Sequence, residues 1–224
     1  MSNSHQVIFL FDVDNTLLDN DRLQQQLGEY LADNYGSQAR TRYFEIFEAL
    51  RQQLGYADYL GALERYRLEK LHDPRVLRMA NWLVDYPFAE RLYPGALEVV
   101  KHVRQWAPAV IFSDGDAVFQ PRKVERSGLW EAVAGNVLIY VHKEQMLEDV
   151  ERLYPADHYV MIDDKLRILS AIKQVWRRRV TTVFPRQGHY AEDAKTLATY
   201  PPADLTVERI AELLNYDLAA FNRF

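Results

Sequence analysis

Acidic side chains recur in this sequence directly after short apolar runs. Asp12 and Asp14 end the first such run, and Asp163 and Asp164 end another about 150 residues later. Clustered carboxylates repel one another unless a cation compensates, and hard oxygen ligands without His or Cys suit Mg²⁺. If the fold brings these four residues together, they predict a magnesium site.

Two further polar groups follow apolar runs between these acidic pairs. Ser113 comes directly after residues 109–112, and Lys143 comes just past residues 137–141. A hydroxyl, an ammonium and a cation together can neutralise and hydrogen-bond a phosphoryl group as its charge redistributes in the transition state. One carboxylate can attack phosphorus, while a second acts first as an acid and then as a base. The combination therefore suits phosphoryl chemistry.

Short apolar runs bounded by polar residues are typical of strands buried on both faces of a parallel sheet. They alternate here with helical patterns, which predicts an α/β fold with a Rossmann-like parallel sheet and helices on both faces. Because parallel strands end at one edge, the polar groups can converge there. Asp14 and Asn15 are turn-prone residues that would let the chain turn as it leaves the first strand. The expected strands are 7–11, 109–112, 137–141, 159–162 and, as the last one, 180–184.

The segment between the first two strands has helical spacing throughout. Four apolar stripes, separated by breaks such as Gly36 and Gly55, predict a small α-helical bundle. We therefore expect an α/β core domain formed by residues 1–18 and 93–224, and a separate helical domain at 19–92. The aromatic residues of these stripes are most simply explained as packing in the bundle, with a substrate-facing role for one or two of them as the lesser alternative.

The composition excludes several classes of protein. With 224 residues, 48% of them hydrophobic, the chain can bury a sizeable core, and its net charge of −5 argues against a general nucleic-acid binder. The absence of cysteine excludes disulfides and a thiolate nucleophile. The opening MSNSHQ lacks a signal-peptide pattern, and no apolar run reaches transmembrane length. We expect a soluble, cytoplasmic protein with no membrane partner.

The four polar positions together resemble a known family. In the haloacid dehalogenase-like (HAD) superfamily of phosphohydrolases, the first strand carries the motif DxDxT, which is present here as Asp12-Val13-Asp14-Asn15-Thr16. The family's later motifs match Ser113 in IFSDGD, Lys143 in VHKEQ, and Asp163-Asp164 in VMIDDK. The resemblance covers nearly the whole chain. It identifies the helical segment after the first motif with the family's helical cap, which covers the site and selects substrates.

The resemblance implies a role for each matched residue. Asp12 would be the nucleophile that forms an aspartyl-phosphate, and Asp14 would protonate the leaving oxygen and then activate water. Ser113 and Lys143 would hold the transferring phosphoryl group, and Asp114 is grouped with them by its location.

The same resemblance implies a ligand set for Mg²⁺. The ion would bind the Asp12 carboxylate, the backbone carbonyl of Asp14 and one carboxylate of the last acidic pair. Asp164 is the first choice for this ligand and Asp163 the second, because the sequence does not determine which side chain faces inward.

Lys143 departs from the commonest pattern of the family because no proline follows it. This leaves Lys123, in QPRKVE, as a rival phosphate ligand. We favour Lys143, since it lies just past a strand, whereas Lys123 is expected within a helix, where a solvated surface position is the default.

Two other functions stay open at this stage. Dehalogenases of the superfamily attack carbon, need no Mg²⁺ and characteristically lack the second aspartate of the first motif, so Asp14 disfavours that chemistry. A phospho-accepting or metal-binding regulatory module would also use clustered aspartates, but it would not need the helical segment. The expected partner is a small phosphorylated metabolite such as a sugar phosphate or nucleotide. The substrate's identity, transfer to a hydroxyl instead of water, and the choice between monomer and homodimer are left undetermined.

Overall fold

A computed structural model of the chain describes residues 5–221. Within this range, six strands form one parallel sheet in the order β3-β2-β1-β4-β5-β6, which confirms the expected fold class. Residues 1–4 and 222–224 lie outside the described residues, as do the parts of the expected core domain and of the opening MSNSHQ that fall on them. The strands are β1 (His5–Phe11), β2 (Ala109–Asp114), β3 (Val137–Tyr140), β4 (Ala156–Ile162), β5 (Val180–Pro185) and β6 (Leu205–Val207).

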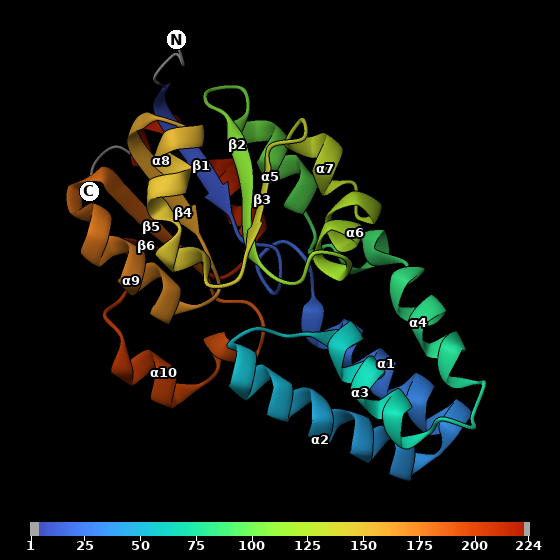
Figure 1. Ribbon diagram of the computed structural model, residues 1–224. Coiled ribbons are helices and arrows are strands. Elements are labelled where there is room, and N and C mark those ends of the chain that lie inside the picture. Colours follow the sequence, from blue (N-terminus) through green and yellow to red (C-terminus); the bar gives the residue numbers. More distant parts are fainter. Residues whose placement is uncertain (1–4, 222–224) are drawn as a thin grey trace.

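Strand β1 lies at the centre because its side chains are apolar on both faces. Val7, Phe9 and Phe11 belong to one buried cluster, and Ile8 and Leu10 belong to the other. This alternation is what a strand covered on both faces requires. Figure 1 shows the two helical layers, with α5, α6 and α7 on one side of the sheet and α8 and α9 on the other.

The helices of the core follow the strands along the chain. The expected helices after the second, third and fourth strands are all present, and the strand expected at 180–184 is β5. That strand is not the last one, however, because β6 pairs with its outer edge. The α-helices are α5 (Ala96–Val103), α6 (Phe119–Arg126), α7 (Leu129–Ala132), α8 (Leu147–Leu153), α9 (Leu166–Trp176), α10 (Ala194–Thr199) and α11 (Leu218–Phe221). Short 3₁₀ turns η2 (Lys143–Gln145), η3 (Arg177–Arg179), η4 (His189–Ala191) and η5 (Ile210–Asn215) complete this part.

The expected helical bundle is present between β1 and β2. It contains α1 (Asn20–Tyr35), α2 (Ser37–Leu54), α3 (Tyr59–Glu69) and α4 (Val76–Val84), followed by the 3₁₀ turn η1 (Phe88–Arg91). The Asp19 side chain caps α1 by accepting from the Arg22 N–H at 2.8 Å, and Gly55 ends α2 in the left-handed conformation with φ of 82°. We refer to α1–α4 as the helical insertion.

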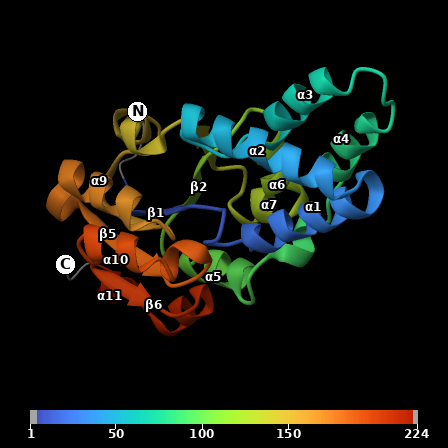
Figure 2. The same cartoon turned by 90° about the horizontal axis from the view of Figure 1, so that it is seen from below.

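The chain leaves and re-enters the core at adjacent points. Leu18 and Leu92 form an isolated antiparallel bridge, and the N–H of Tyr93 donates to the carbonyl of Leu17 at 2.9 Å. Seen from below in Figure 2, α1, α3 and α4 extend to one side of the molecule, away from β5 and α9. Asp21 of α1 and Arg51 of α2 hydrogen-bond to His189 and Tyr190 of η4, just before α10. Among the described residues, no helix combines the length and the apolar character needed to cross a bilayer.

Candidate active site

Asp12 occupies the first position beyond β1 and is almost fully buried, with 2% of its surface exposed. Its Oδ1 lies 2.6 Å from Nζ of Lys143 and accepts from Oγ of Ser113 at 3.3 Å. Its Oδ2 accepts from Oγ1 of Thr16, also at 3.3 Å. The structure thus brings the matched residues of the first three motifs into contact around one carboxylate.

The chain turns sharply after Asp12, as the sequence predicted. Asn15 has φ of 59°, in the left-handed region that asparagine tolerates, and its N–H donates to the carbonyl of Leu18 at 2.7 Å. Its side-chain oxygen accepts from the backbone N–H groups of Asn20 and Asp21 at 3.0 and 3.2 Å. The turn leaves the side chain of Asp14 partly exposed in a cleft, while that of Asp12 stays buried.

Lys143 is fully buried between two carboxylates. Besides Asp12, its ammonium lies 2.6 Å from Oδ2 of Asp163, and it donates to the carbonyl of Phe112 at 3.1 Å. Burial alone would lower the pKa of Lys143, but the charges of Asp12 and Asp163 outweigh it and raise the pKa above its ordinary value. The backbone N–H of Lys143 donates to Oδ1 of Asp114 at 2.6 Å, so the Asp114 carboxylate fixes this loop. A phosphate-binding role for Asp114 stays a prediction.

Asp163 and Asp164 follow β4, whose residue Ile162 pairs in register with Phe11 of β1. This register brings one oxygen each of Asp12, Asp163 and Asp164 within 4.8 Å of one another. Oδ1 of Asp163 accepts from the backbone N–H of Lys165 at 2.8 Å. By contrast, neither carboxylate oxygen of Asp164 has a hydrogen-bond partner among residues 5–221, although this side chain is fully buried.

The charge state of the three carboxylates depends on what surrounds them. Burial raises the pKa of Asp164 well above its ordinary value, and it raises that of Asp163 to about 6 despite the nearby Lys143. For Asp12, burial is outweighed by Lys143 and Lys165, so its pKa is lowered. For Asp163 and Asp164, the cost of burying a carboxylate thus outweighs the effect of the nearby Lys143 and Lys165 ammonium groups.

Lys123 lies in helix α6, as predicted, but its expected solvated position is wrong. The side chain is fully buried, and Nζ donates to Oδ1 of Asp14 at 2.5 Å and to Oδ1 of Asn20 at 3.1 Å. The ammonium also lies 5.3 Å from the centre of the Phe119 ring. A buried ion pair with a cation–π contact replaces solvation here.

Two polar residues at the site were missed by the sequence analysis. Gln120, buried on α6, donates from Nε2 to Oγ of Ser113 at 3.0 Å. Lys165 places its ammonium 3.9 Å from Oδ1 of Asp164. Gln120 lies three residues before Lys123 and Lys165 follows Asp164, but these positions alone did not indicate the contacts, which depend on how α6 and α9 pack on the sheet.

A cleft of about 370 Å³ lies between the core and the helical insertion, and Asp14 and Asp114 line it. The insertion contributes aromatic residues to the wall, including Phe47, Tyr56 and Tyr59.

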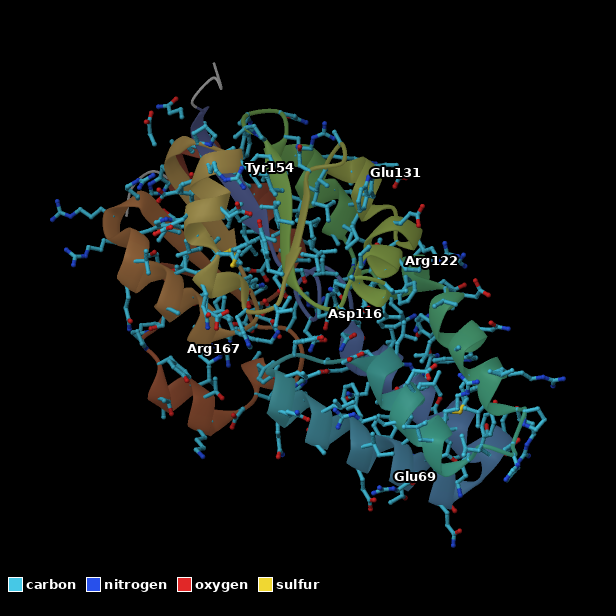
Figure 3. All side chains as sticks on the ribbon, in the orientation of Figure 1. Glu69, Asp116, Arg122, Glu131, Tyr154 and Arg167 are labelled. Atoms are coloured by element: carbon cyan, nitrogen blue, oxygen red, sulfur yellow. The ribbon has the colours of Figure 1, made fainter. Side chains whose placement is uncertain are left out.

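Arg51 of α2 also lines the cleft, and its Nη1 donates to the hydroxyl of Tyr190 in the core at 3.3 Å. Asp116 and Arg167, labelled in Figure 3, lie on the side of the core that faces the insertion.

The comparisons with known proteins agree with this arrangement. A profile of the haloacid dehalogenase-like hydrolases matches residues 7–175, about three quarters of the chain. The chain belongs to the HAD-like hydrolase family. A solved structure from Burkholderia xenovorans LB400, described as a haloacid dehalogenase-like hydrolase, is 59% identical. It superposes with a TM-score of 0.92, with 96% of this chain and 98% of that chain covered.

More distant structures share the fold. The HAD-hydrolase YfnB of Bacillus subtilis, solved bound to magnesium, is 14% identical with a TM-score of 0.61, and the alignment covers 95% of this chain and 98% of that chain. The L-2-haloacid dehalogenase of Xanthobacter autotrophicus is 17% identical with a TM-score of 0.59, with coverage of 93% and 96%. The comparison with curated proteins found no significant match. The family is therefore established, and the helical insertion after β1 corresponds to its cap.

Proposed function

We propose that this HAD-like hydrolase is a Mg²⁺-dependent phosphatase that hydrolyses a small phosphorylated metabolite through an aspartyl-phosphate at Asp12. The observation that carries the proposal is the Asp164 carboxylate, which is fully buried with neither oxygen hydrogen-bonded among the described residues, the Lys165 ammonium lying 3.9 Å from its Oδ1. A buried carboxylate without a partner is costly unless a cation compensates for it. Phosphoryl transfer uses such a cation, whereas attack on a carbon–halogen bond has no need of one.

The residues present fit Mg²⁺. Asp12, Asp163 and Asp164 offer hard carboxylate oxygens within 4.8 Å of one another, with no sulfur or imidazole among them. Asp12 and Asp164 would hold the ion together with the backbone carbonyl of Asp14. Asp163 is the weaker choice, because its two oxygens face the Lys143 ammonium and the Lys165 N–H. When bound, the ion supplies charge neutralisation for the phosphoryl oxygens.

In the first step, the Asp12 carboxylate attacks phosphorus and a new oxygen–phosphorus bond forms. The bond from phosphorus to the ester oxygen breaks, and Asp14 donates a proton to that oxygen so that the alcohol leaves. Lys143 and Ser113, which lie 2.6 and 3.3 Å from the Asp12 carboxylate, are placed to donate hydrogen bonds to the phosphoryl oxygens.

In the second step, Asp14 is a carboxylate and takes a proton from a water molecule. This water attacks phosphorus, the bond to Asp12 breaks, and inorganic phosphate leaves. Asp14 is suited to both steps because the turn at Asn15 carries it away from Asp12 into the cleft where substrate and water can enter. The YfnB structure was solved with magnesium, which supports the same cofactor for this chain.

The proposal is tested by hydrolysis of p-nitrophenyl phosphate with Mg²⁺, with EDTA, and by the Asp12→Asn variant. We expect activity only for the wild-type protein with Mg²⁺, and a loss of at least about 1,000-fold in kcat for the variant. In parallel, L-2-chloropropionate is offered without metal, and chloride release is measured. Chloride release in EDTA with no phosphatase activity would contradict the proposal and make the protein a dehalogenase. Phosphorylation of Asp12 without turnover would indicate a regulatory module.

A further inference from the structure

Helix α6 carries two buried polar side chains that contact the site, and the fold match does not assign them a role. We infer that Lys123 is a positioning residue that holds Asp14 for proton transfer and connects it to the helical insertion. The inference rests on the proposed function, since it concerns the acid and base of that reaction.

The contact between Lys123 and Asp14 is short and shielded from water. Lys123 is fully buried, and its ammonium is 2.5 Å from Oδ1 of Asp14, of whose side chain 20% is exposed. Burying an ammonium is costly, and the chain offsets this cost with one carboxylate, one amide oxygen and the Phe119 ring. Oδ1 of Asp14 is thereby fixed, which leaves Oδ2 as the oxygen that is free to turn toward a leaving group in the cleft.

Gln120 provides a second observation on the same helix. It lies three residues before Lys123, a spacing that places two side chains on one face of a helix. Gln120 donates to Oγ of Ser113, and Lys123 donates to Asp14, so one helical face orients a group on each side of the reacting centre. This pairing distinguishes Lys123 from a lysine that was buried only for packing.

The contact continues into the helical insertion through Asn20, the first residue of α1. Asn20 accepts from Lys123 through Oδ1 and donates from Nδ2 to the hydroxyl of Tyr59 at 3.1 Å. Tyr59 begins α3 and is buried in the insertion, with 1% of its surface exposed. The Tyr59 hydroxyl orients the Asn20 amide with its oxygen toward Lys123. A displacement of α3 would therefore disturb the groups that hold Asp14.

The kinetic consequence depends on the leaving group. A poor leaving group needs the proton from Asp14 as its bond to phosphorus breaks, whereas a good one leaves without it. Since kcat/KM reports the steps up to release of the alcohol, it isolates the acid role of Asp14 from the later attack by water. A loss of positioning should therefore be large for phenyl phosphate and small for 2,4-dinitrophenyl phosphate.

The experiment measures kcat/KM for 2,4-dinitrophenyl, 4-nitrophenyl and phenyl phosphate with saturating Mg²⁺. For Lys123→Met we expect a loss of about 10- to 100-fold with phenyl phosphate and of less than about threefold with 2,4-dinitrophenyl phosphate. Asp14→Asn should show the same dependence on the leaving group. The double variant should be hardly slower than Asp14→Asn alone, because the two residues act as one unit.

A matched pair of tyrosines tests the connection to the insertion. Tyr59→Phe removes the hydroxyl that orients Asn20, whereas Tyr43→Phe removes an equally buried hydroxyl that donates to the Tyr59 carbonyl at 2.9 Å. We expect a smaller loss with the same leaving-group dependence for Tyr59→Phe, and no such dependence for Tyr43→Phe. This pair and Asn20→Ala carry the test if Lys123→Met does not fold.

Uniform losses across the three substrates for Lys123→Met and Tyr59→Phe would overturn the inference and leave Lys123 a structural residue. So would a leaving-group dependence for Asp14→Asn that Lys123→Met does not share. Neither result would contradict the proposed phosphatase function, because both require a wild-type protein that hydrolyses the substrates. Failure of the wild-type protein on all three esters would instead remove the proposed function, and the inference with it.

Discussion

The carboxyl edge of the sheet and the helical insertion bury polar groups in opposite ways. In the insertion, the hydroxyl of Tyr43 donates to the Tyr59 carbonyl, and that of Tyr86 donates to the side chain of Gln26. At the sheet edge, both oxygens of Asp164 lack a partner among the described residues, and Lys143 is held between two carboxylates. One region satisfies its polar groups internally, while the other retains charge that a bound cation would compensate.

This difference indicates where each region contributes. Buried polar groups that are fully hydrogen-bonded stabilise a fold, whereas unsatisfied ones are usually retained for chemistry. We therefore expect substitutions in the insertion to lower the free energy of unfolding more than the activity. Neutralising a carboxylate of the Asp163-Asp164 pair at the sheet edge should instead lower the activity and raise the free energy of unfolding in the absence of metal.

The largest effect should come from Lys143→Met. This variant removes the ammonium group that lies between two buried carboxylates at the sheet edge. Asp12 and Asp163 would be left buried without their shared partner. We expect the free energy of unfolding in EDTA to fall by about 3–5 kcal/mol at pH 8, and phosphatase activity to be lost. Chemical denaturation measures the first quantity. Lys101→Met, at an exposed position, is the control, and a similar loss there would contradict this explanation.

A substitution in the insertion should lower the stability and leave the activity of the folded protein nearly unchanged. Leu27→Ala removes a fully buried side chain from α1, which should lower the free energy of unfolding by about 3 kcal/mol. Below the unfolding temperature, we expect kcat to stay within about threefold of the wild-type value because no group at the sheet edge changes. Leu68→Ala, at a position that is 69% exposed, should change the stability by less than about 0.5 kcal/mol. A large loss of kcat in folded Leu27→Ala would break the comparison.

Asp164→Asn should raise stability without metal and lower activity. The variant keeps the shape of the side chain but removes a buried charge that has no hydrogen bond among the described residues and whose Lys165 counterion lies 3.9 Å away. At pH 8 in EDTA, we expect its free energy of unfolding to exceed that of the wild-type protein by roughly 1–3 kcal/mol. Added Mg²⁺ should raise the melting temperature of the wild-type protein and not that of the variant. Equal stabilisation of both proteins by Mg²⁺ would show that Asp164 is not a ligand.

The titration of Asp163 should make the free energy of unfolding depend on pH. The pKa of Asp163 is raised to about 6 in the folded protein, so the folded state binds this proton more tightly than the unfolded state does. The resulting stabilisation is present below about pH 4 and is lost as the pH rises through 6. In EDTA, Asp163→Asn should thus gain about 2 kcal/mol relative to the wild-type protein between pH 4 and pH 8. A difference that does not change with pH would contradict the assignment.

Much of the fold could be predicted because the relevant signals are local. The run Val7–Phe11 indicates a buried strand by itself, and Gly36 and Gly55 mark helix ends in the insertion. Strand β6, Leu205–Val207, was missed because three residues after a pair of prolines show no periodicity. Its pairing with β5 is determined by the packing of the C-terminal segment and not by its own sequence.

The site could be predicted where it depends on strand ends and not where it depends on helix packing. Asp12, Ser113, Lys143 and the pair Asp163-Asp164 meet because parallel strands share an edge. Lys123 was expected at a solvated surface because most helical lysines are exposed. Lys123 shares a helical face with the apolar Phe119, four residues earlier, and this spacing was the signal for its burial. The contact of that face with Asp14 depends on how α6 packs on the sheet, which the spacing does not specify.

The bridge between Leu18 and Leu92 has a consequence for how such a protein can change over evolutionary time. A segment that starts and ends at paired residues can be lengthened, shortened or exchanged without altering the distance that the remaining chain must span. The strand register around Asp12, set by β2 and β4, does not depend on the content of that segment. Different substrate preferences can therefore arise by replacing one continuous piece of sequence, while the residues that would carry out the chemistry are inherited unchanged.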